Sequence, residues 1–275
     1  MTNTLLDDEG LAQVAEPKIR FDRVSKVYAT DSGQPVVALS ETSIDIAEGE
    51  FLCVVGPSGC GKSTLMQMLA GFHHPTSGRV LVDGVEVRRP DAERGVVFQQ
   101  ANLYPWLTTR GNVELGPRIR GVGKAERRAR AEQFLSMVGL AAFADRKPYE
   151  LSGGMQQRAQ IARVLANDPE VILMDEPFGA LDALTRERMQ VELLQIWRER
   201  RKTLVFIITH DVDEAIFLGT RVLVMSARPG RVLMDLPTRL PVEIPSGELR
   251  THPTFVELRD TLTAAIYRAQ DGAAH

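Results

Sequence analysis

The chain has 275 residues, of which 44% are hydrophobic and 25% are charged, and its formal net charge is -3. This composition is typical of a globular protein and excludes the disordered and fibrous classes. Because there is no basic excess, we expect no nucleic-acid partner. Cys53 and Cys60 lie on either side of a glycine-rich turn, a spacing that suits neither a disulfide framework nor a zinc site and that indicates a reducing, cytoplasmic compartment.

The N-terminal part of the chain is predicted to contain a tail followed by short strands. Residues 1–16 begin with polar and acidic side chains and lack the pattern of a secretory signal, so we expect a flexible tail. Alternating segments at residues 19–21 and 36–44 predict antiparallel strands. A continuous apolar run at residues 51–55 enters the glycine-rich turn, and residues 63–70 predict a helix.

The middle of the chain changes from strands to helices. Residues 79–87 predict a strand and a turn, and residues 95–98 predict a short buried strand. Strand signals are absent from residues 102–149, and residues 124–138 have the periodicity of an amphipathic, arginine-rich helix. This stretch is therefore predicted to be a helical insertion.

Strands and helices alternate in the last third of the chain, which predicts a mainly parallel sheet. The apolar runs here are strand-sized, far below the ~18 residues of a membrane-spanning helix. The predicted strands are 171–174, 203–209 and 221–225, and the predicted helices are 154–167, 184–201, one beginning at Asp213, and 255–269.

A phosphate-binding loop is indicated by residues 56–63, Gly-Pro-Ser-Gly-Cys-Gly-Lys-Ser, which match G-x-x-x-x-G-K-[ST] in full between a predicted strand and a predicted helix. Backbone N–H groups and the helix N-terminus would hold phosphate oxygens, Lys62 would reach the β- and γ-phosphates, and Ser63 would hold Mg²⁺. A plain glycine-rich turn with a solvated lysine is the alternative, and the strand-loop-helix context disfavours it. Cys60 is interpreted as a small filler rather than a nucleophile. The predicted ATP-binding residues of this loop are Gly56, Pro57, Ser58, Gly59, Cys60, Gly61, Lys62, Ser63 and Thr64.

Two carboxylates follow the apolar run at residues 171–174, at the strand edge where open α/β sheets bind ligands. Asp175 would support Mg²⁺, directly or through its water, and Glu176 would polarise the attacking water as a general base. Acidic residues can also simply end a strand. The phosphate-binding loop in the same chain favours a catalytic site.

Phosphate-loop ATPases include kinases, helicases, recombinases and transporters, and a third motif separates them. Residues 151–158, Leu-Ser-Gly-Gly-Met-Gln-Gln-Arg, resemble the signature of ABC ATPases. Ser152 and the N–H groups of Gly153 and Gly154 would form a second anion site at a helix N-terminus, although Ser152 could serve only as a helix cap. Two anion sites in one chain suggest that one of them serves the ATP of a neighbouring subunit.

The resemblance to ABC ATPases extends from about Ile19 to Gly230 and implies further site residues. Tyr28 matches the aromatic residue that stacks on adenine, and Gln99 matches the glutamine that senses Mg²⁺, the water and the membrane subunit. Asp182 matches a loop that crosses the dimer interface, and His210 matches the histidine that contacts the γ-phosphate. On their own, Tyr28 could be a strand-packing residue and His210 a surface or capping residue.

The resemblance also implies the architecture. We expect an α/β fold: a phosphate-loop NTPase core with a mainly parallel sheet, an N-terminal antiparallel β subdomain and an α-helical insertion subdomain. The expected ATPase domain is 17–240, with the helical subdomain at about 100–155 inserted in the RecA-like core. Residues 241–275 are expected to form a C-terminal extension that is mainly helical.

Within the ABC family, the chain looks like the nitrate, sulfonate and taurine importer group at residues 103–107, 175–186 and 226–231. It departs from that group at Gly219-Thr220, where relatives commonly have Ala-Asp. The resemblance implies an ATP-hydrolysing importer subunit that is peripheral to the cytoplasmic face of the inner membrane. Its implied partners are a second copy in a head-to-tail ATP sandwich, membrane permease subunits and, indirectly, a periplasmic or extracellular solute-binding protein.

The helical insertion is the expected docking surface for the membrane subunit, with Tyr104, Pro105 and Trp106 as candidates; ordinary local packing is the alternative. Two other classes of ABC protein fit the sequence less well. Relatives that serve DNA repair or ribosomes usually carry long coiled-coil insertions or duplicated ATPase halves, which this sequence lacks. Regulatory relatives tend to lose the catalytic residues, which this sequence retains.

Overall fold

The structure is a computed structural model, and no helix among its described residues is long and apolar enough to cross a membrane. Of the predicted flexible tail, only Glu16 is described, so that prediction lies outside the described residues. The structure describes residues 16–29, 34–200, 203–227, 229–240 and 246–271.

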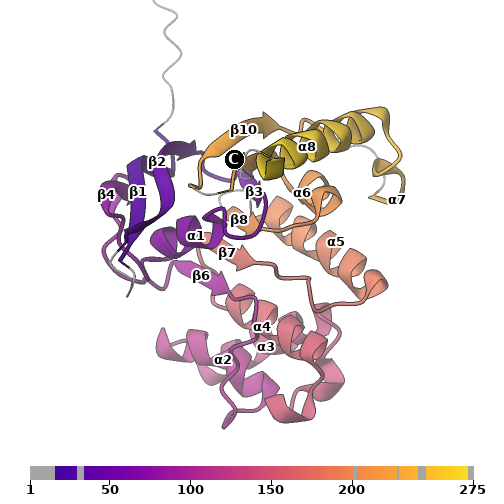
Figure 1. Cartoon of the computed structure of the whole chain (residues 1–275). Helices are drawn as coiled ribbons and strands as arrows, with labels where there is room; N and C mark the ends of the chain where they lie inside the picture. Colours follow the sequence, from indigo (N-terminus) through magenta and orange to yellow (C-terminus); the bar gives the residue numbers. More distant parts are fainter. Residues whose placement is uncertain (1–15, 30–33, 201–202, 228, 241–245, 272–275) are drawn as a thin grey trace, which may run out of the picture.

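A four-stranded antiparallel sheet lies at one side of the molecule, as predicted, and is labelled β1, β2 and β4 in Figure 1. Its strand order is β2-β1-β4-β5. The first strand is longer than predicted, because irregular pairing after Phe21 interrupts the alternation of apolar and polar residues. The strands are β1 (Ile19–Tyr28), β2 (Val36–Ile46), β4 (Ser77–Val82) and β5 (Val85–Glu86).

The second sheet has six strands in the order β10-β9-β3-β8-β7-β6, and all neighbours except β10 and β9 are parallel. The mainly parallel sheet is thus confirmed, and β10 is an antiparallel edge strand that the sequence did not predict. Its side chains alternate between half-buried and exposed, and its apolar run, Val232 to Met234, is short and followed by Asp235. The strands are β3 (Phe51–Val55), β6 (Arg94–Val97), β7 (Val171–Asp175), β8 (Leu204–Ile208), β9 (Arg221–Met225) and β10 (Val232–Pro237).

Helices lie on both faces of this sheet. Along β3, Phe51 and Cys53 belong to one hydrophobic core, and the alternate residues Leu52 and Val54 belong to another. In Figure 1 the helical insertion forms the lower part of the molecule, with α2, α3 and α4 together. The bounds are α1 (Lys62–Ala70), α2 (Thr109–Ile119), α3 (Lys124–Met137), α4 (Gly153–Ala166), α5 (Ala183–Glu199) and α6 (Val212–Leu218), with short 3-10 turns at Ala141–Phe143 and Pro148–Glu150.

The C-terminal extension folds back onto the sheet. Two helices are described, α7 (Ser246–Leu249) and α8 (Pro253–Asp271), and the second confirms the helix predicted at residues 255–269. Phe255 and Leu262 are fully buried in the main core. In Figure 1, α8 lies beside β10 and α6, which it contacts. The extension is therefore packed against α6, the helix that follows β8 in the chain.

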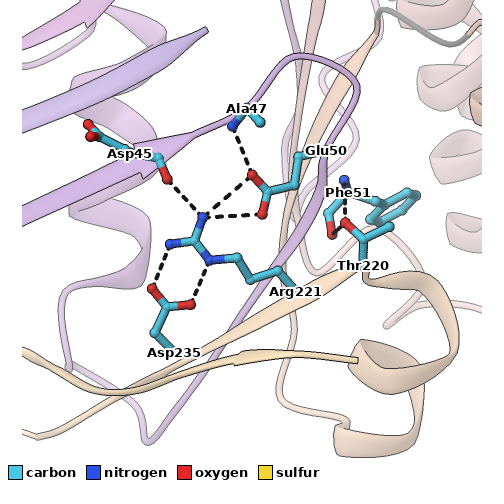
Figure 2. Close-up of polar contacts among 7 residues, drawn as sticks. All are labelled: Asp45, Ala47, Glu50, Phe51, Thr220, Arg221 and Asp235. Carbon is cyan, nitrogen blue, oxygen red and sulfur yellow. Dashed lines mark hydrogen bonds and ion pairs between the residues drawn. The ribbon is translucent and has the colours of Figure 1, made fainter. Parts of the chain in front are cut away.

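Arg221, the first residue of β9, joins the two sheets (Figure 2). Its guanidinium forms a bidentate ion pair with Asp235 of β10, at 2.6 and 2.5 Å, and donates to the carbonyl of Asp45 in β2 at 2.8 Å. It also pairs with Glu50 at 3.2 Å. Hydrogen bonding to Asp235 raises the pKa of Arg221, which keeps the guanidinium charged. The antiparallel sheet is thus fixed to the sheet that carries the phosphate-binding loop.

Candidate functional site

The phosphate-binding loop connects β3 to α1, as the sequence predicted. The Lys62 side chain is buried, and its Nζ donates to the carbonyls of Gly56 and Pro57 at 2.7 and 3.0 Å. The thiol of Cys60 lies 3.6 Å from the same nitrogen and is also buried, which fits the interpretation of Cys60 as a filler. Two carbonyls and one thiol of the loop therefore surround the ammonium group of Lys62.

Glycine is required in this loop for steric reasons. Gly56 has φ 150°, and a Cβ there would lie 2.5 Å from the carbonyl oxygen of Met225. Gly61 has φ 91° and precedes the first residue of α1, so the backbone turns directly into the helix N-terminus. Both features suit a loop whose N–H groups converge on phosphate oxygens.

Asp175 ends β7 beside the phosphate-binding loop. Its carboxylate accepts a hydrogen bond from Ser63, the second residue of α1. Burial raises the pKa of Asp175, and the hydrogen bond from Ser63 opposes that rise. A hydroxyl and a carboxylate side by side form an oxygen donor set of the kind that binds Mg²⁺ together with substrate phosphates, so these residues fit that ion.

Glu176 occupies the next position and has an unusual backbone. Its φ is 45°, in the left-handed region that residues other than glycine seldom adopt, and its N–H donates to the carbonyl of Ile208 in β8 at 2.9 Å. Such conformations cluster at functional sites, where the surrounding structure holds them. The hydrogen bond to Ile208 fixes Glu176 at the edge of the sheet.

Two further predicted residues converge on Glu176. The Nε2 atom of Gln99 donates to Oε2 of Glu176 at 3.0 Å, and Nδ1 of His210 lies 3.5 Å from the same oxygen. Gln99 follows β6, and His210 follows β8; these strands flank β7 in the parallel sheet. The carboxyl ends of three adjacent strands thus bring together one carboxylate, one amide and one imidazole.

The remaining predicted residues lie elsewhere. Ser152 caps α4 by accepting from the N–H of Met155 at 3.3 Å, and Asp182 caps α5 by accepting from the N–H of Thr185 at 3.0 Å. Gly153 and Gly154 form the first turn of α4, which belongs to the lower part of the molecule in Figure 1, whereas α1 lies in the upper part. The structure therefore does not bring the signature segment together with the phosphate-binding loop of the same chain.

Tyr28 ends β1 and is partly exposed. Its ring packs edge-on against His73 at 6.4 Å between centroids, and the ammonium of Lys26 lies 5.1 Å from its centre. The ring is held in place by these neighbours, and part of it stays accessible.

Sequence reasoning missed the buried polar residues that support the site. Gln157 and Gln160 of α4 both donate to the carbonyl of Phe98, at 3.1 and 2.7 Å, and Gln160 accepts from the N–H of Asn102 at 2.9 Å. Glu214 of α6 is also buried. Polar residues at apolar positions of amphipathic helices were the available signal, because buried polar groups need partners.

The fold and the site define a phosphate-loop nucleoside triphosphate hydrolase. A model of the family described as ABC transporter matches residues 39–179. An uncharacterized ABC transporter ATP-binding protein of Methanocaldococcus jannaschii is 54% identical over 242 residues, which cover 88% of each chain. The chain belongs to the ABC transporter family, in which it is an ATP-binding, ATP-hydrolysing subunit.

Other relatives and solved structures agree with this assignment. The taurine import ATP-binding protein of Pseudomonas aeruginosa is 52% identical over 234 residues, covering 84% of this chain and 89% of the relative. Its counterpart in Rhizobium johnstonii is 48% identical over 257 residues, covering 92% and 98%. The dimeric structure of an ATP-binding cassette in a post-hydrolysis state, bound to ADP and Pi, has a TM-score of 0.73 at 37% identity and covers 80% of this chain and 99% of that one.

Proposed function

We propose that the chain powers an importer for a small anionic solute such as nitrate, a sulfonate or taurine. The observation that carries the proposal is the convergence of Gln99 and His210 on one oxygen of Glu176, beside the Ser63–Asp175 pair. The names of two relatives, which are taurine import ATP-binding proteins, support import and favour taurine among these solutes.

The proposed chemistry follows from the positions of the side chains. The phosphate-binding loop and Lys62 hold the phosphates of ATP, and Glu176 accepts a proton from the attacking water as general base. Gln99 and His210 hold Glu176 and the water in line with the γ-phosphate. Mg²⁺, held by Ser63, Asp175 and Gln99, would neutralise charge that develops on the phosphate oxygens.

The chain works as a head-to-tail pair in this proposal. The signature residues Ser152, Gly153 and Gly154 belong to the helical part rather than to the phosphate-binding loop, so a second copy would supply them to the bound ATP. Asp182 would contact that copy, and Tyr28 would stack on adenine. The solved ATP-binding cassette compared above is dimeric, which supports this arrangement.

Membrane permease subunits would dock on the helical insertion. Tyr104 and Trp106 are exposed, their ring centroids are 5.3 Å apart, and Pro105 between them is exposed as well. The carbonyl of Trp106 accepts from Lys147 at 2.7 Å, so the aromatic pair is presented on a fixed backbone. We propose that this chain is peripheral to the cytoplasmic face of the membrane. A solute-binding protein on the opposite side of the membrane would complete the importer.

The proposed division of the chain matches this scheme. Residues 17–240 form the ATPase domain, with the helical subdomain at about 100–155, and residues 241–275 form the extension. Hydrolysis and reopening of the pair would drive a two-state cycle, because ATP phosphates contact both copies only when the pair is closed.

Substitution of Glu176 by Gln tests the proposal. We expect ATP turnover of the chain, purified with its membrane subunits, to fall by about two orders of magnitude or more, because the general base is lost while the side-chain shape is kept. ATP should then trap the pair in its closed form, which size-exclusion chromatography with light scattering measures.

The matched control is Glu187→Gln, an exposed glutamate of α5, which should leave turnover and dimerisation unchanged. Unchanged turnover in Glu176→Gln would contradict the proposed general base. A chain that stays monomeric with ATP would contradict the proposed ATP-driven pair.

A further inference from the structure

The turn that carries His210 is held on both sides by Glu214. The side chain of Thr209 is hydrogen-bonded to the Glu214 carboxylate, and its Oγ1 accepts from the N–H of Asp211 at 3.1 Å. The Asp211 carboxylate in turn accepts from the N–H of Glu214 at 3.1 Å, which caps α6. Because the Thr209 oxygen already accepts from the backbone, its hydroxyl proton is available for Glu214. The residue before His210 therefore contacts the buried Glu214 carboxylate, and the residue after His210 contacts the Glu214 backbone.

Glu214 shares the walls of a small cavity of about 40 Å³ with Glu176 and His210. A space of this size admits little more than one water molecule. A displacement of the Glu214 side chain therefore changes the wall of a space that His210 also lines.

Gln190 of α5 connects Glu214 to the C-terminal extension. Its side chain is buried, its Nε2 donates to Oε2 of Glu214 at 3.1 Å, and its Oε1 accepts from Nη2 of Arg250 at 3.1 Å. Arg250 can only donate, so it fixes the amide with the oxygen toward itself and the nitrogen toward Glu214. The guanidinium also lies 5.5 Å from the ring centre of Phe217 in α6.

We propose that the C-terminal extension takes part in ATP hydrolysis through Arg250, a positioning residue that acts on His210 by way of Gln190 and Glu214. Arg250 directly follows α7, and the extension is anchored in the core by Phe255. The inference rests on the role proposed above for His210.

Loss of Arg250 has a defined physical consequence. Without that donor, the buried Oε1 atom of Gln190 loses its hydrogen-bond partner. The amide is then no longer fixed in one orientation, so its Nε2 atom no longer holds Oε2 of Glu214 in one place. The Glu214 side chain, and the Thr209 side chain bonded to it, would become less ordered beside His210.

Steady-state ATP turnover of Arg250→Met tests the inference, in the full chain purified with its membrane subunits. We expect kcat to fall by roughly three- to tenfold while KM for ATP changes by less than about twofold, because the phosphate-binding loop is untouched. Arg250→Lys keeps a donor at this place and should restore most of kcat. Arg268→Met, a matched exposed arginine of α8, should leave kcat unchanged.

A second variant and a reference variant complete the test. Gln190→Leu breaks the same connection from the other end, and the double variant with Arg250→Met should be no slower than the slower single variant, because both act on one chain of contacts. Wild-type kcat in both single variants, or equal loss in Arg250→Lys and Arg250→Met, would overturn the inference.

His210→Ala separates the two proposals. If His210→Ala is inactive while the Arg250 and Gln190 variants are normal, the inference alone fails. If His210→Ala keeps full turnover, the role of His210 itself fails.

Discussion

Gly219, which follows α6, has space for a hydrogen atom and little else. A Cβ at this position would lie 2.7 Å from the carbonyl oxygen of Ala215 and 3.0 Å from the sulfur of Cys53. The hydroxyl of its neighbour Thr220 accepts from the N–H of Phe51 at 3.1 Å and donates to the Phe51 carbonyl at 3.2 Å, as Figure 2 shows. The N–H of Thr220 donates to the same carbonyl at 2.8 Å. The Gly219-Thr220 pair therefore packs the end of α6 tightly against β3.

Substitution of Gly219 by Ala should lower the free energy of unfolding by about 1–3 kcal/mol, because the added methyl group overpacks a site bounded by backbone. Urea denaturation followed by circular dichroism measures the change. Gly123→Ala is the control, since a Cβ at Gly123 meets nothing within 4 Å. Equal stability of the two variants would show that the backbone around Gly219 relaxes at no cost.

Single residues of the site were predictable where a motif or a strand end marked them. Asp175 and Glu176 follow a buried apolar run, and the geometry of a parallel sheet places such residues at its ligand-binding edge. The convergence of Gln99 and His210 on one oxygen could not be predicted, because it depends on which strands are neighbours. Strand order is a long-range property that periodicity does not contain.

At the scale of elements, α4 does more than present the signature segment. Gln160 joins both ends of the segment that contains Gln99, because it donates to the carbonyl of Phe98 and accepts from the N–H of Asn102. Arg163, one turn further along, donates to the carbonyl of Asn102 and lies over the ring of Tyr104. One helix therefore contacts both the segment that contains Gln99 and the exposed aromatic pair of Tyr104 and Trp106.

Replacement of Gln160 by Leu should loosen that segment. The carbonyl of Phe98 keeps its bond from Gln157, but the N–H of Asn102 loses its partner, at a cost of about 1–3 kcal/mol in stability. Hydrogen–deuterium exchange should be faster in the peptide that covers residues 98–104 and unchanged in β3. Gln195→Leu, an exposed residue of α5, is the control. Unchanged exchange at residues 98–104 would show that the hydrogen bonds of Gln160 do not hold this segment in place.

The predictability of elements followed the strength of their patterns. The helix at the C-terminus was predicted because its apolar positions repeat with helical spacing, and α8 buries them. The strand β10 was missed because its stability comes from pairing with β9 and from the ion pair between Asp235 and Arg221, which are contacts between distant segments.

At the scale of the whole molecule, charge buried at the junction of the extension and the core makes stability depend on pH. Burial raises the pKa of Glu214 from 4.5 to about 7, against the opposing effect of hydrogen bonds from Thr209 and Gln190. Asp211 raises this pKa further, and Arg186 of α5 lowers it. Burial raises the pKa of the Cys53 thiol in β3 well above its usual range, and the charge of Glu214 raises it further. The thiol therefore stays neutral.

The sign of the pH dependence follows from proton binding. Below about pH 4.5, Glu214 is protonated in the folded and unfolded chain, and its full contribution is present. Between pH 4.5 and 7 the folded chain keeps a proton that the unfolded chain has lost, so stability falls as pH rises and levels off above pH 7. The pKa of Glu214 thus differs by about 2.5 units between the folded and unfolded chain, which corresponds to a change of roughly 3 kcal/mol in the free energy of unfolding.

Glu214→Gln removes this titration while keeping the size of the side chain. We expect the free energy of unfolding of the wild type, minus that of Glu214→Gln, to decrease by roughly 3 kcal/mol from pH 4.5 to pH 7.5, as measured by urea denaturation at a series of pH values. Taking the difference cancels titrations that both chains share, including that of Asp175. A difference that stays constant would mean that Glu214 has the same pKa in the folded and unfolded chain, so that the hydrogen bonds from Gln190 and Thr209 fully offset the effect of burial. A difference that increases with pH would mean that these hydrogen bonds, which also hold the turn that carries His210, stabilise the carboxylate more than burial destabilises it.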